Sequence, residues 1–189
     1  MSLRLTLISN ATTHAVHSAC FPSDEPLDQR GEEQTQAVAG VFRSVRIAYT
    51  SPALRARQTA SALKLNATVE PALRDCDYGR WAGRPLEEVQ AKEPEAVAAW
   101  MAEPHSAPHG GESIITVLQR VATWLDARSE MGRMVAVTHP TIVRTAILHV
   151  LGASVESFWR IDVEPLGRTE FSHDGRRWIL RSVNSALPQ

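Results

Sequence analysis

Near its amino terminus the chain carries a run rich in leucine and isoleucine, Leu3 to Ser9, which we interpret as a continuous apolar strand and which is followed by a polar loop reaching Pro26. A continuous apolar run of this length is typical of a strand buried on both faces of a parallel sheet. Loops that follow such strands hold the reacting side chains of many α/β enzymes. The run therefore predicts a central strand with Asn10 at its carboxyl end, although an amide is not a usual covalent nucleophile.

Strand-like and helix-like patterns alternate along most of the 189 residues. Further strands are predicted over Val45–Tyr49, Ala67–Glu70, Met134–Thr138, Ile161–Val163, Arg168–Ser172 and Trp178–Val183. Helices are predicted over Leu27–Phe42, Ala53–Lys64, Leu86–Lys92, Pro94–Met101, Glu112–Ser129 and Pro140–Leu151. This alternation favours a three-layer α/β/α sandwich with a mainly parallel central sheet and an antiparallel element near the carboxyl terminus. The length predicts one domain over residues 1–189.

The segment from about 75 to 111 interrupts the alternation, since it is rich in Pro, Gly, Trp and charged residues. We interpret it as an insertion, or lid, over one end of the sheet, because long irregular segments in compact domains are often functional. Its Trp81, Trp100 and Met101 either line an apolar wall of a ligand site or only hold the lid together.

Charge and composition exclude several classes of partner. Lys and Arg number 20 and Asp and Glu 21, so no broad basic field exists for nucleic acid or a membrane surface. No apolar run approaches the roughly 18 residues of a membrane span, and no signal-peptide pattern is present, so a cytoplasmic location is expected. His14 and His17 have a metal-ligand spacing without a third ligand, so we expect surface histidines, no metal and no cofactor. The sequence does not fix an oligomeric state.

Two basic residues follow predicted strands. His139 precedes Pro140, the expected first residue of a helix, and a helix amino terminus favours an anion. The histidine either donates to a phosphate oxygen there or only caps the helix. Arg55 and Arg57 cannot share a helix face, and Arg55, in the first turn with Ser51 as the expected cap, is the better phosphate ligand. The alternative is two solvated helix arginines.

The loop from Leu73 to Gly83 contains two carboxylates, Asp75 and Asp77. A carboxylic acid beside a phosphate ester can protonate the leaving oxygen, whereas loop carboxylates also commonly close turns. The stretch His109 to Ser113 indicates a helix start rather than a P-loop, because it lacks the Lys-Ser/Thr ending.

Together these segments resemble the histidine phosphatase superfamily, which has the phosphoglycerate-mutase-like fold. Two of them carry the likeness: Leu27–Gln34 follows the family's Leu-Thr-x-x-Gly-x-x-Gln, and Ser51–Ala60 follows Ser-Pro-x-x-Arg-Ala-x-Gln-Thr-Ala. Leu73–Gly83, Gly110–Ser113 and Thr138–Thr141 match further family motifs, so the likeness covers nearly the whole chain.

The resemblance implies a role for each matching residue. Arg55 would clamp a phosphoryl group, and His139 would donate to it and stabilise charge in the transition state. Asp75 stands where the family usually has a Glu proton donor, and Thr138 would add a hydroxyl contact.

The family's Arg-His-Gly motif is replaced here by Ser9-Asn10-Ala11. Asn10 stands at the position of the nucleophilic histidine, and Ser9 at that of a phosphate-binding arginine. Loss of a covalent nucleophile lowers rates by about 10⁴ to 10⁶. The sequence therefore leaves open an impaired phosphomonoesterase, in which Asp75 activates water directly, and a pseudoenzyme that binds phosphate or a small phosphorylated molecule without turnover. A third alternative is an α/β domain with no anion site.

Overall fold

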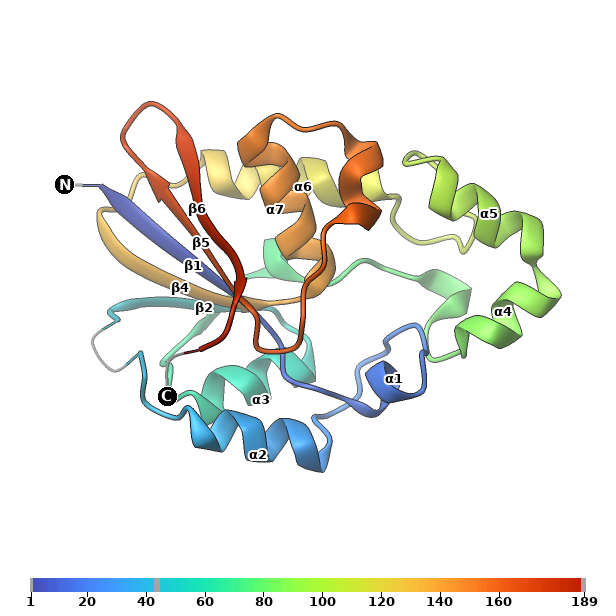
Figure 1. Ribbon diagram of the computed structural model, residues 1–189, viewed down its shortest axis with the longest axis horizontal. Helices are drawn as coiled ribbons and strands as arrows, with labels where there is room; N and C mark the ends of the chain where they lie inside the picture. Colours follow the sequence, from blue (N-terminus) through green and yellow to red (C-terminus); the bar gives the residue numbers. More distant parts are fainter. Residues whose placement is uncertain (1, 43–44, 188–189) are drawn as a thin grey trace.

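The fold is built on a six-stranded sheet with the order β3-β2-β4-β1-β5-β6, seen in a computed structural model that describes residues 2–42 and 45–187 (Figure 1). The strands are β1 (Leu3–Ser9), β2 (Ile47–Thr50), β3 (Thr68–Val69), β4 (Gly132–Thr138), β5 (Arg168–His173) and β6 (Trp178–Ser185). Strands β1 to β4 pair in parallel, and β5 and β6 add antiparallel strands beside β1. The predicted mainly parallel sheet with an antiparallel element is confirmed.

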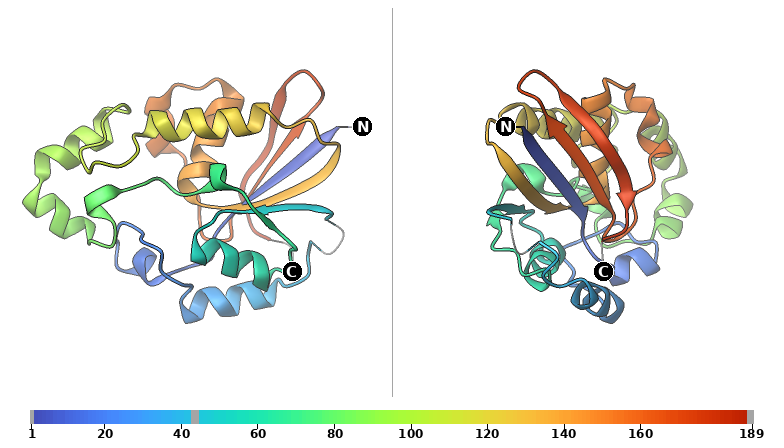
Figure 2. Two further views of the ribbon diagram at one scale, coloured as in Figure 1. Left: turned by 180° about the vertical axis from the view of Figure 1, so that it is seen from behind. Right: turned by 60° about the vertical axis from the view of Figure 1, so that its left-hand side comes forward.

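Helices cover both faces of the sheet (Figure 2). Leu5 and Leu7 of β1 face α6 (Ile114–Asp126) and α7 (Pro140–Leu151), whereas Ile8 faces the opposite layer, α3 (Leu54–Ala62). Helix α2 (Gln29–Ala37) packs on α3. Apolar and polar residues alternate in the first half of β1, where Arg4 is exposed, whereas the second half, from Leu7 to Ser9, is buried on both faces of the sheet. The three-layer sandwich predicted from the sequence is therefore confirmed.

The carboxyl ends of the parallel strands meet at one edge of the sheet. Ser9 of β1 lies in register with Thr138 of β4, and the backbone N–H of Asn10 donates to the Thr138 carbonyl at 2.8 Å. On the other side of β4, the N–H of Ser51 donates to the Val137 carbonyl at 2.9 Å. The residues that follow three separate strands are thus brought together by the ladder.

Two predicted elements differ from the structure. The helix expected over Leu27–Phe42 is shorter, because Asp28 caps its start and Gly40 has a left-handed backbone (φ 89°) beyond its end. The strand expected over Ile161–Val163 is absent, and that prediction is wrong. The Ile161 carbonyl accepts instead from Arg144 Nε at 2.7 Å, after a 3₁₀ helix, η3 (Val155–Arg160).

The predicted polar loop after β1 contains a single helical turn, α1 (His14–His17). Its two histidines bond to neighbouring side chains: His17 Nε2 lies 3.0 Å from Asp28 Oδ2, and His14 Nε2 lies 3.1 Å from Ser18 Oγ.

The segment after β3 extends past the carboxyl end of the sheet (Figure 1). It contains the 3₁₀ turns η1 (Pro71–Leu73) and η2 (Gly79–Trp81) and the helices α4 (Leu86–Lys92) and α5 (Pro94–Ala102). Trp81 and Trp100 pack with Phe21 in a separate buried cluster, while Met101 is exposed. The tryptophans therefore hold this segment together, which is the second of the two alternatives drawn from the sequence. Within residues 2–42 and 45–187, no helix is long and apolar enough to cross a membrane.

Candidate functional site

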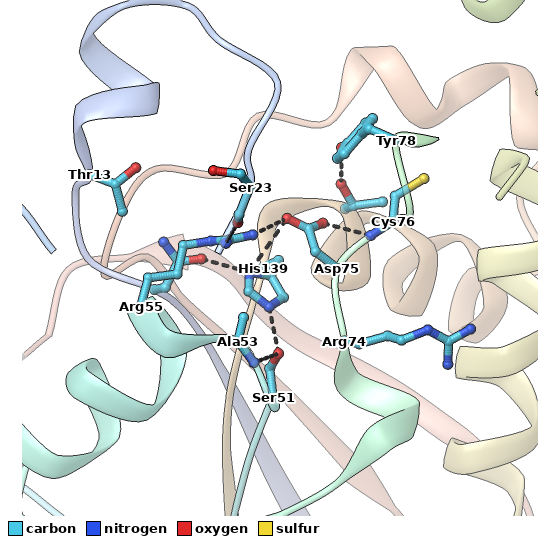
Figure 3. A network of polar contacts seen from close by, with 12 residues as sticks. Thr13, Ser23, Ser51, Ala53, Arg55, Arg74, Asp75, Cys76, Tyr78 and His139 are labelled. Carbon is cyan, nitrogen blue, oxygen red and sulfur yellow. Dashed lines mark hydrogen bonds and ion pairs between the residues drawn. The ribbon is translucent and has the colours of Figure 1, made fainter. Parts of the chain in front are cut away.

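Four residues singled out from the sequence converge at the carboxyl edge of the sheet. Figure 3 shows Arg55, Asp75 and His139 pointing toward one another, and the fourth residue is Asn10. Asp75 Oδ2 lies 2.7 Å from Arg55 Nη2 and 3.5 Å from His139 Nδ1. His139 Nδ1 also lies 2.9 Å from Asn10 Oδ1. Asn10, Arg55 and His139 are each exposed by 6% or less. The loop carboxylate thus sits between the guanidinium and the imidazole that were expected to hold an anion.

The hydrogen bonds of His139 define its tautomer. Asn10 Nδ2 donates to the Ala11 carbonyl at 2.9 Å, so Asn10 Oδ1 faces His139 and can only accept. Nδ1 of His139 therefore donates, and Nε2 accepts from the Ser51 hydroxyl at 2.7 Å. Burial lowers the pKa of His139 to about 4, against the attraction of Asp75, so the ring is neutral at pH 7.

His139 occupies the cap position of α7, but its side chain makes no capping hydrogen bond. His139 therefore caps α7 by its position and its backbone carbonyl, which accepts from the N–H groups of Ile142 and Val143, while its side chain contacts Asn10 and Ser51. Ser51 was expected to cap α3, yet Ala53 holds that position. The Ser51 hydroxyl instead accepts from the Ala53 N–H at 3.2 Å while it donates to His139. Ser51 thus couples the start of α3 to the imidazole, a contact that the sequence pattern did not reveal.

Arg55 lies in the first turn of α3 and is only 4% exposed. Its Nη2 donates to Asp75 and its Nη1 to the Ser23 carbonyl at 2.6 Å, while Glu25 Oε1 lies 3.9 Å away. Arg57, two residues on, is exposed. Arg55 lines the cavity described below, and its donors are turned toward protein acceptors. Its role as a phosphate ligand stays a prediction.

The Asp75 carboxylate is held ionised by its surroundings. Burial by itself would raise its pKa, but the His139 ring, the Arg55 guanidinium and the Cys76 N–H together hold the pKa below its ordinary value. The Cys76 N–H donates to Oδ1 at 2.9 Å. Asp77, by contrast, accepts from the Gly79 N–H at 2.8 Å and closes a turn. Of the two loop carboxylates, only Asp75 belongs to the site.

A cavity of about 200 Å³ opens over these residues. Among its lining residues are Ser9, Asn10, Arg55, Asp75, Thr141 and Arg144. The Ser9 hydroxyl is buried and has no hydrogen-bond partner in the described part of the chain. Thr138 does not line the cavity, because its hydroxyl is buried and donates to the Leu73 carbonyl at 2.8 Å. His139 lies beneath the cavity and contacts it through Asn10 and Asp75.

Among the residues of the cavity wall that sequence reasoning missed are Tyr78, Thr141 and Arg144. The Tyr78 hydroxyl lies 3.2 Å from the Thr141 hydroxyl, and Arg144 follows Pro140 by one helical turn. That spacing was available as a signal, because residues four apart share one helix face. Pro140 and Thr141 also line the cavity, so the amino terminus of α7 opens onto it.

Comparison with known proteins agrees with this fold. Residues 11–186 match the histidine phosphatase superfamily (branch 1), so the chain belongs to that family. It is similar to phosphoserine phosphatase 1 of Hydrogenobacter thermophilus, with 29% identity over 171 residues that cover 85% of this chain and 81% of the relative.

Two mycobacterial proteins are also similar. The chain is 30% identical over 170 residues to a bifunctional protein of Mycobacterium tuberculosis, covering 84% of this chain but only 46% of that protein. The chain therefore spans about half the length of this relative. The solved structure of a mycobacterial glucosyl-3-phosphoglycerate phosphatase with vanadate superimposes with a TM-score of 0.84 at 26% identity, covering 97% of this chain and 99% of the other.

Proposed function

We propose that this chain binds a small phosphomonoester, with the phosphoryl group between Arg55 and His139, and that Asn10 prevents turnover through a phosphohistidine. The observation that carries the proposal is the position of Asp75 Oδ2, within 2.7 Å of Arg55 Nη2 and 3.5 Å of His139 Nδ1. An anionic oxygen at this point is already favoured by the protein. A phosphoryl oxygen has the same requirements for donors and charge.

On binding, the phosphoryl group of the ligand takes the place of the Asp75 carboxylate beside Arg55 and His139. The phosphoryl oxygens accept from Arg55, and the unpartnered Ser9 hydroxyl supplies a further donor. The single N–H of His139, which donates to Asn10 Oδ1 in the unliganded chain, turns to a phosphoryl oxygen on binding. The amino terminus of α7 at the cavity adds a favourable field for the negative charge. These contacts support a phosphomonoester ligand, as do the similar proteins, which are named as phosphatases for phosphoserine and glucosyl-3-phosphoglycerate.

Displacement changes the protonation of Asp75. Once separated from Arg55 and placed beside a phosphoryl dianion, the carboxyl loses its stabilising cation and gains a like charge, so its pKa rises. The protonated form then donates to an ester oxygen. In an active phosphatase, the same proton would pass to the leaving group.

Asn10 removes the covalent step. Its Oδ1 accepts from His139 and its Nδ2 donates to Ala11, and an amide nitrogen has no basic lone pair to attack phosphorus. The rate through a covalent intermediate is lower by about 10⁴ to 10⁶ than in an enzyme with a nucleophile there. We therefore propose a phosphatase-type binding site that acts as a pseudoenzyme.

A second candidate is slow hydrolysis by water with Asp75 as general base. The buried, ionised carboxylate at the cavity favours it. The same observation limits it, since a carboxylate whose pKa lies below its ordinary value is a weak base.

Phosphate binding and hydrolysis test the proposal together. Calorimetry with inorganic phosphate and vanadate, and hydrolysis of p-nitrophenyl phosphate, are measured for the unchanged chain, Asn10→His and Asp75→Asn. We expect binding without hydrolysis in the unchanged chain, and a gain of at least about 100-fold with an acid-labile phosphoenzyme in Asn10→His. Absence of phosphate binding contradicts the proposal. Hydrolysis by the unchanged chain that disappears in Asp75→Asn favours the water route instead.

A further inference from the structure

Arg144 differs from Arg55 although both line the same cavity. It lies on α7, with its Nε donating to the Ile161 carbonyl at 2.7 Å and its guanidinium over the Phe158 ring at 5.4 Å. Arg55 is neutralised by Asp75 at 2.7 Å. Arg144 has no carboxylate oxygen within 4.0 Å among residues 2–42 and 45–187. The cavity therefore contains one paired and one unpaired cation.

The contacts that Arg144 makes within the chain use only part of its side chain. A single N–H satisfies the Ile161 carbonyl, which leaves the two terminal NH₂ groups without a protein acceptor in the described residues. Asp162 and Asp75 attract the guanidinium without forming an ion pair with it, and a half-buried cation that lacks a direct partner is unfavourable because it loses hydration. Burial accordingly lowers the pKa of Arg144, yet the group remains charged at neutral pH.

The other polar groups of this wall are also donors. Tyr78 shares a hydrogen bond with Thr141, and burial raises the pKa of its phenol well above the ordinary value, so it keeps its proton. Arg144, Tyr78 and Thr141 line the same cavity as Arg55. The single positive charge of Arg144 is balanced by a ligand group that carries one negative charge. A carboxylate meets this condition and matches the planar guanidinium, whereas a second phosphoryl group carries nearly two charges.

Resting on the proposed function, we propose that Arg144 is a specificity residue that binds a carboxylate on the non-phosphorylated end of the ligand. The site then prefers phosphorylated carboxylic acids to phosphomonoesters whose remainder is neutral. Arg55 and His139 bind the phosphoryl group common to both kinds of ligand, and Arg144 discriminates between them.

A matched pair of ligands tests this assignment. 3-Phosphoglycerate carries a carboxylate where glycerol 3-phosphate carries a neutral CH₂OH group, and both are titrated calorimetrically into the intact chain. We expect the first to bind at least about tenfold more tightly. In Arg144→Gln the ratio falls below about twofold while the affinity for inorganic phosphate changes little, and Arg144→Lys retains part of the preference. The control Arg57→Gln, on an exposed arginine, leaves the ratio unchanged.

The outcomes separate the two proposals. Equal affinities for the two ligands in a chain that binds inorganic phosphate overturn the role of Arg144 and leave the phosphoryl site intact. A preference that persists in folded Arg144→Gln also overturns it. Failure to bind inorganic phosphate at all overturns the proposed function itself. If Arg144→Gln does not fold, Arg144→Lys still decides, because it keeps the charge and loses the planar fork of the guanidinium. Full retention of the preference in Arg144→Lys, at the level of the Arg57→Gln control, or its complete loss would each contradict the proposed contact.

Discussion

Arginine side chains lie at both ends of the central sheet, but they are buried and hydrogen-bonded at one end and exposed to solvent at the other. At the carboxyl end, Arg55 is 4% exposed and every donor contact described for it reaches a fixed acceptor. At the amino end, Arg4 of β1 and Arg133 of β4 are register neighbours, and both are exposed to solvent. The comparison shows that an arginine by itself does not mark a site. Burial together with directed hydrogen bonds does, because only the surrounding fold keeps such a charge in place.

The energies at the two ends differ for the same reason. A buried ion pair is strongly disrupted when one partner is removed, whereas exposed charges contribute little to stability. Like charges on neighbouring strands are slightly unfavourable, so Arg4 and Arg133 gain nothing from their proximity. Four experiments test this contrast, and the largest effect is expected at the carboxyl end.

Arg55→Met is expected to have the largest effect. The substitution leaves the buried Asp75 carboxylate unpaired, which lowers the free energy of unfolding by about 3–5 kcal/mol, and it weakens phosphate binding by at least about 100-fold. Urea unfolding and phosphate calorimetry measure the two effects. Adding Asp75→Asn should restore much of the stability but none of the binding. Unchanged phosphate affinity in Arg55→Met would show that the anion site lies elsewhere.

The pH dependence of stability tests His139. The pKa of His139 is about 4 in the folded chain, against the ordinary value of 6.5 that applies to the unfolded chain. Between pH 4 and pH 6.5 the unfolded chain therefore binds more protons than the folded chain. The neutral His139 ring therefore contributes about 3 kcal/mol to the free energy of unfolding. This contribution is complete above about pH 6.5 and is lost as the pH falls toward 4. Urea unfolding from pH 7 to pH 4 should therefore show a flatter profile for His139→Gln than for the unchanged chain.

The exposed His105→Gln provides the matched control, and its profile should follow that of the unchanged chain. Parallel profiles for His139→Gln and the unchanged chain would mean that His139 is not buried in its neutral form.

Asp75→Asn should tighten phosphate binding. The ligand no longer competes with an internal carboxylate for Arg55, so we expect an affinity about tenfold higher, equivalent to about 1.4 kcal/mol. Calorimetry in buffers of different ionisation enthalpy adds a second readout. Proton uptake on binding should be present in the unchanged chain and reduced in the variant. Weaker binding in Asp75→Asn would indicate that the carboxylate supports the anion rather than competing with it.

The smallest effect is expected at the amino end. Arg4→Gln and Arg133→Gln should change the free energy of unfolding by less than about 0.5 kcal/mol, and phosphate affinity by less than about twofold. The same calorimetry and urea unfolding measure both. A tenfold loss of phosphate affinity in either variant would show that an exposed arginine at the amino end also supports phosphate binding, and would contradict the contrast between the two ends.

The sequence predicted those parts of the molecule that local pattern controls. The apolar run of β1 fixed a buried central strand, and the positions of Arg55 and His139 after successive strands placed both at one edge of the sheet. The contact between Asp75 and Arg55 spans 20 residues, and that between His139 and Ser51 spans 88, so neither follows from local spacing.

The errors arose where tertiary contacts outweighed local preference. Ile161–Val163 has strand-like residues, but Arg144 takes the Ile161 carbonyl that a strand ladder would use. Thr138 stands beside the site in sequence, yet strand alternation turns its hydroxyl toward Leu73. Arg144 was not singled out from the sequence, although its spacing of four residues from Pro140 puts both on one face of the helix.

A crystal structure of the chain with bound vanadate tests the central claim most directly. The account predicts one anion with oxygens in hydrogen-bonding distance of Arg55 Nη2 and His139 Nδ1, with the Asp75 carboxylate displaced from Arg55. An intact Arg55–Asp75 ion pair, with vanadate bound at another place or not at all, would contradict it.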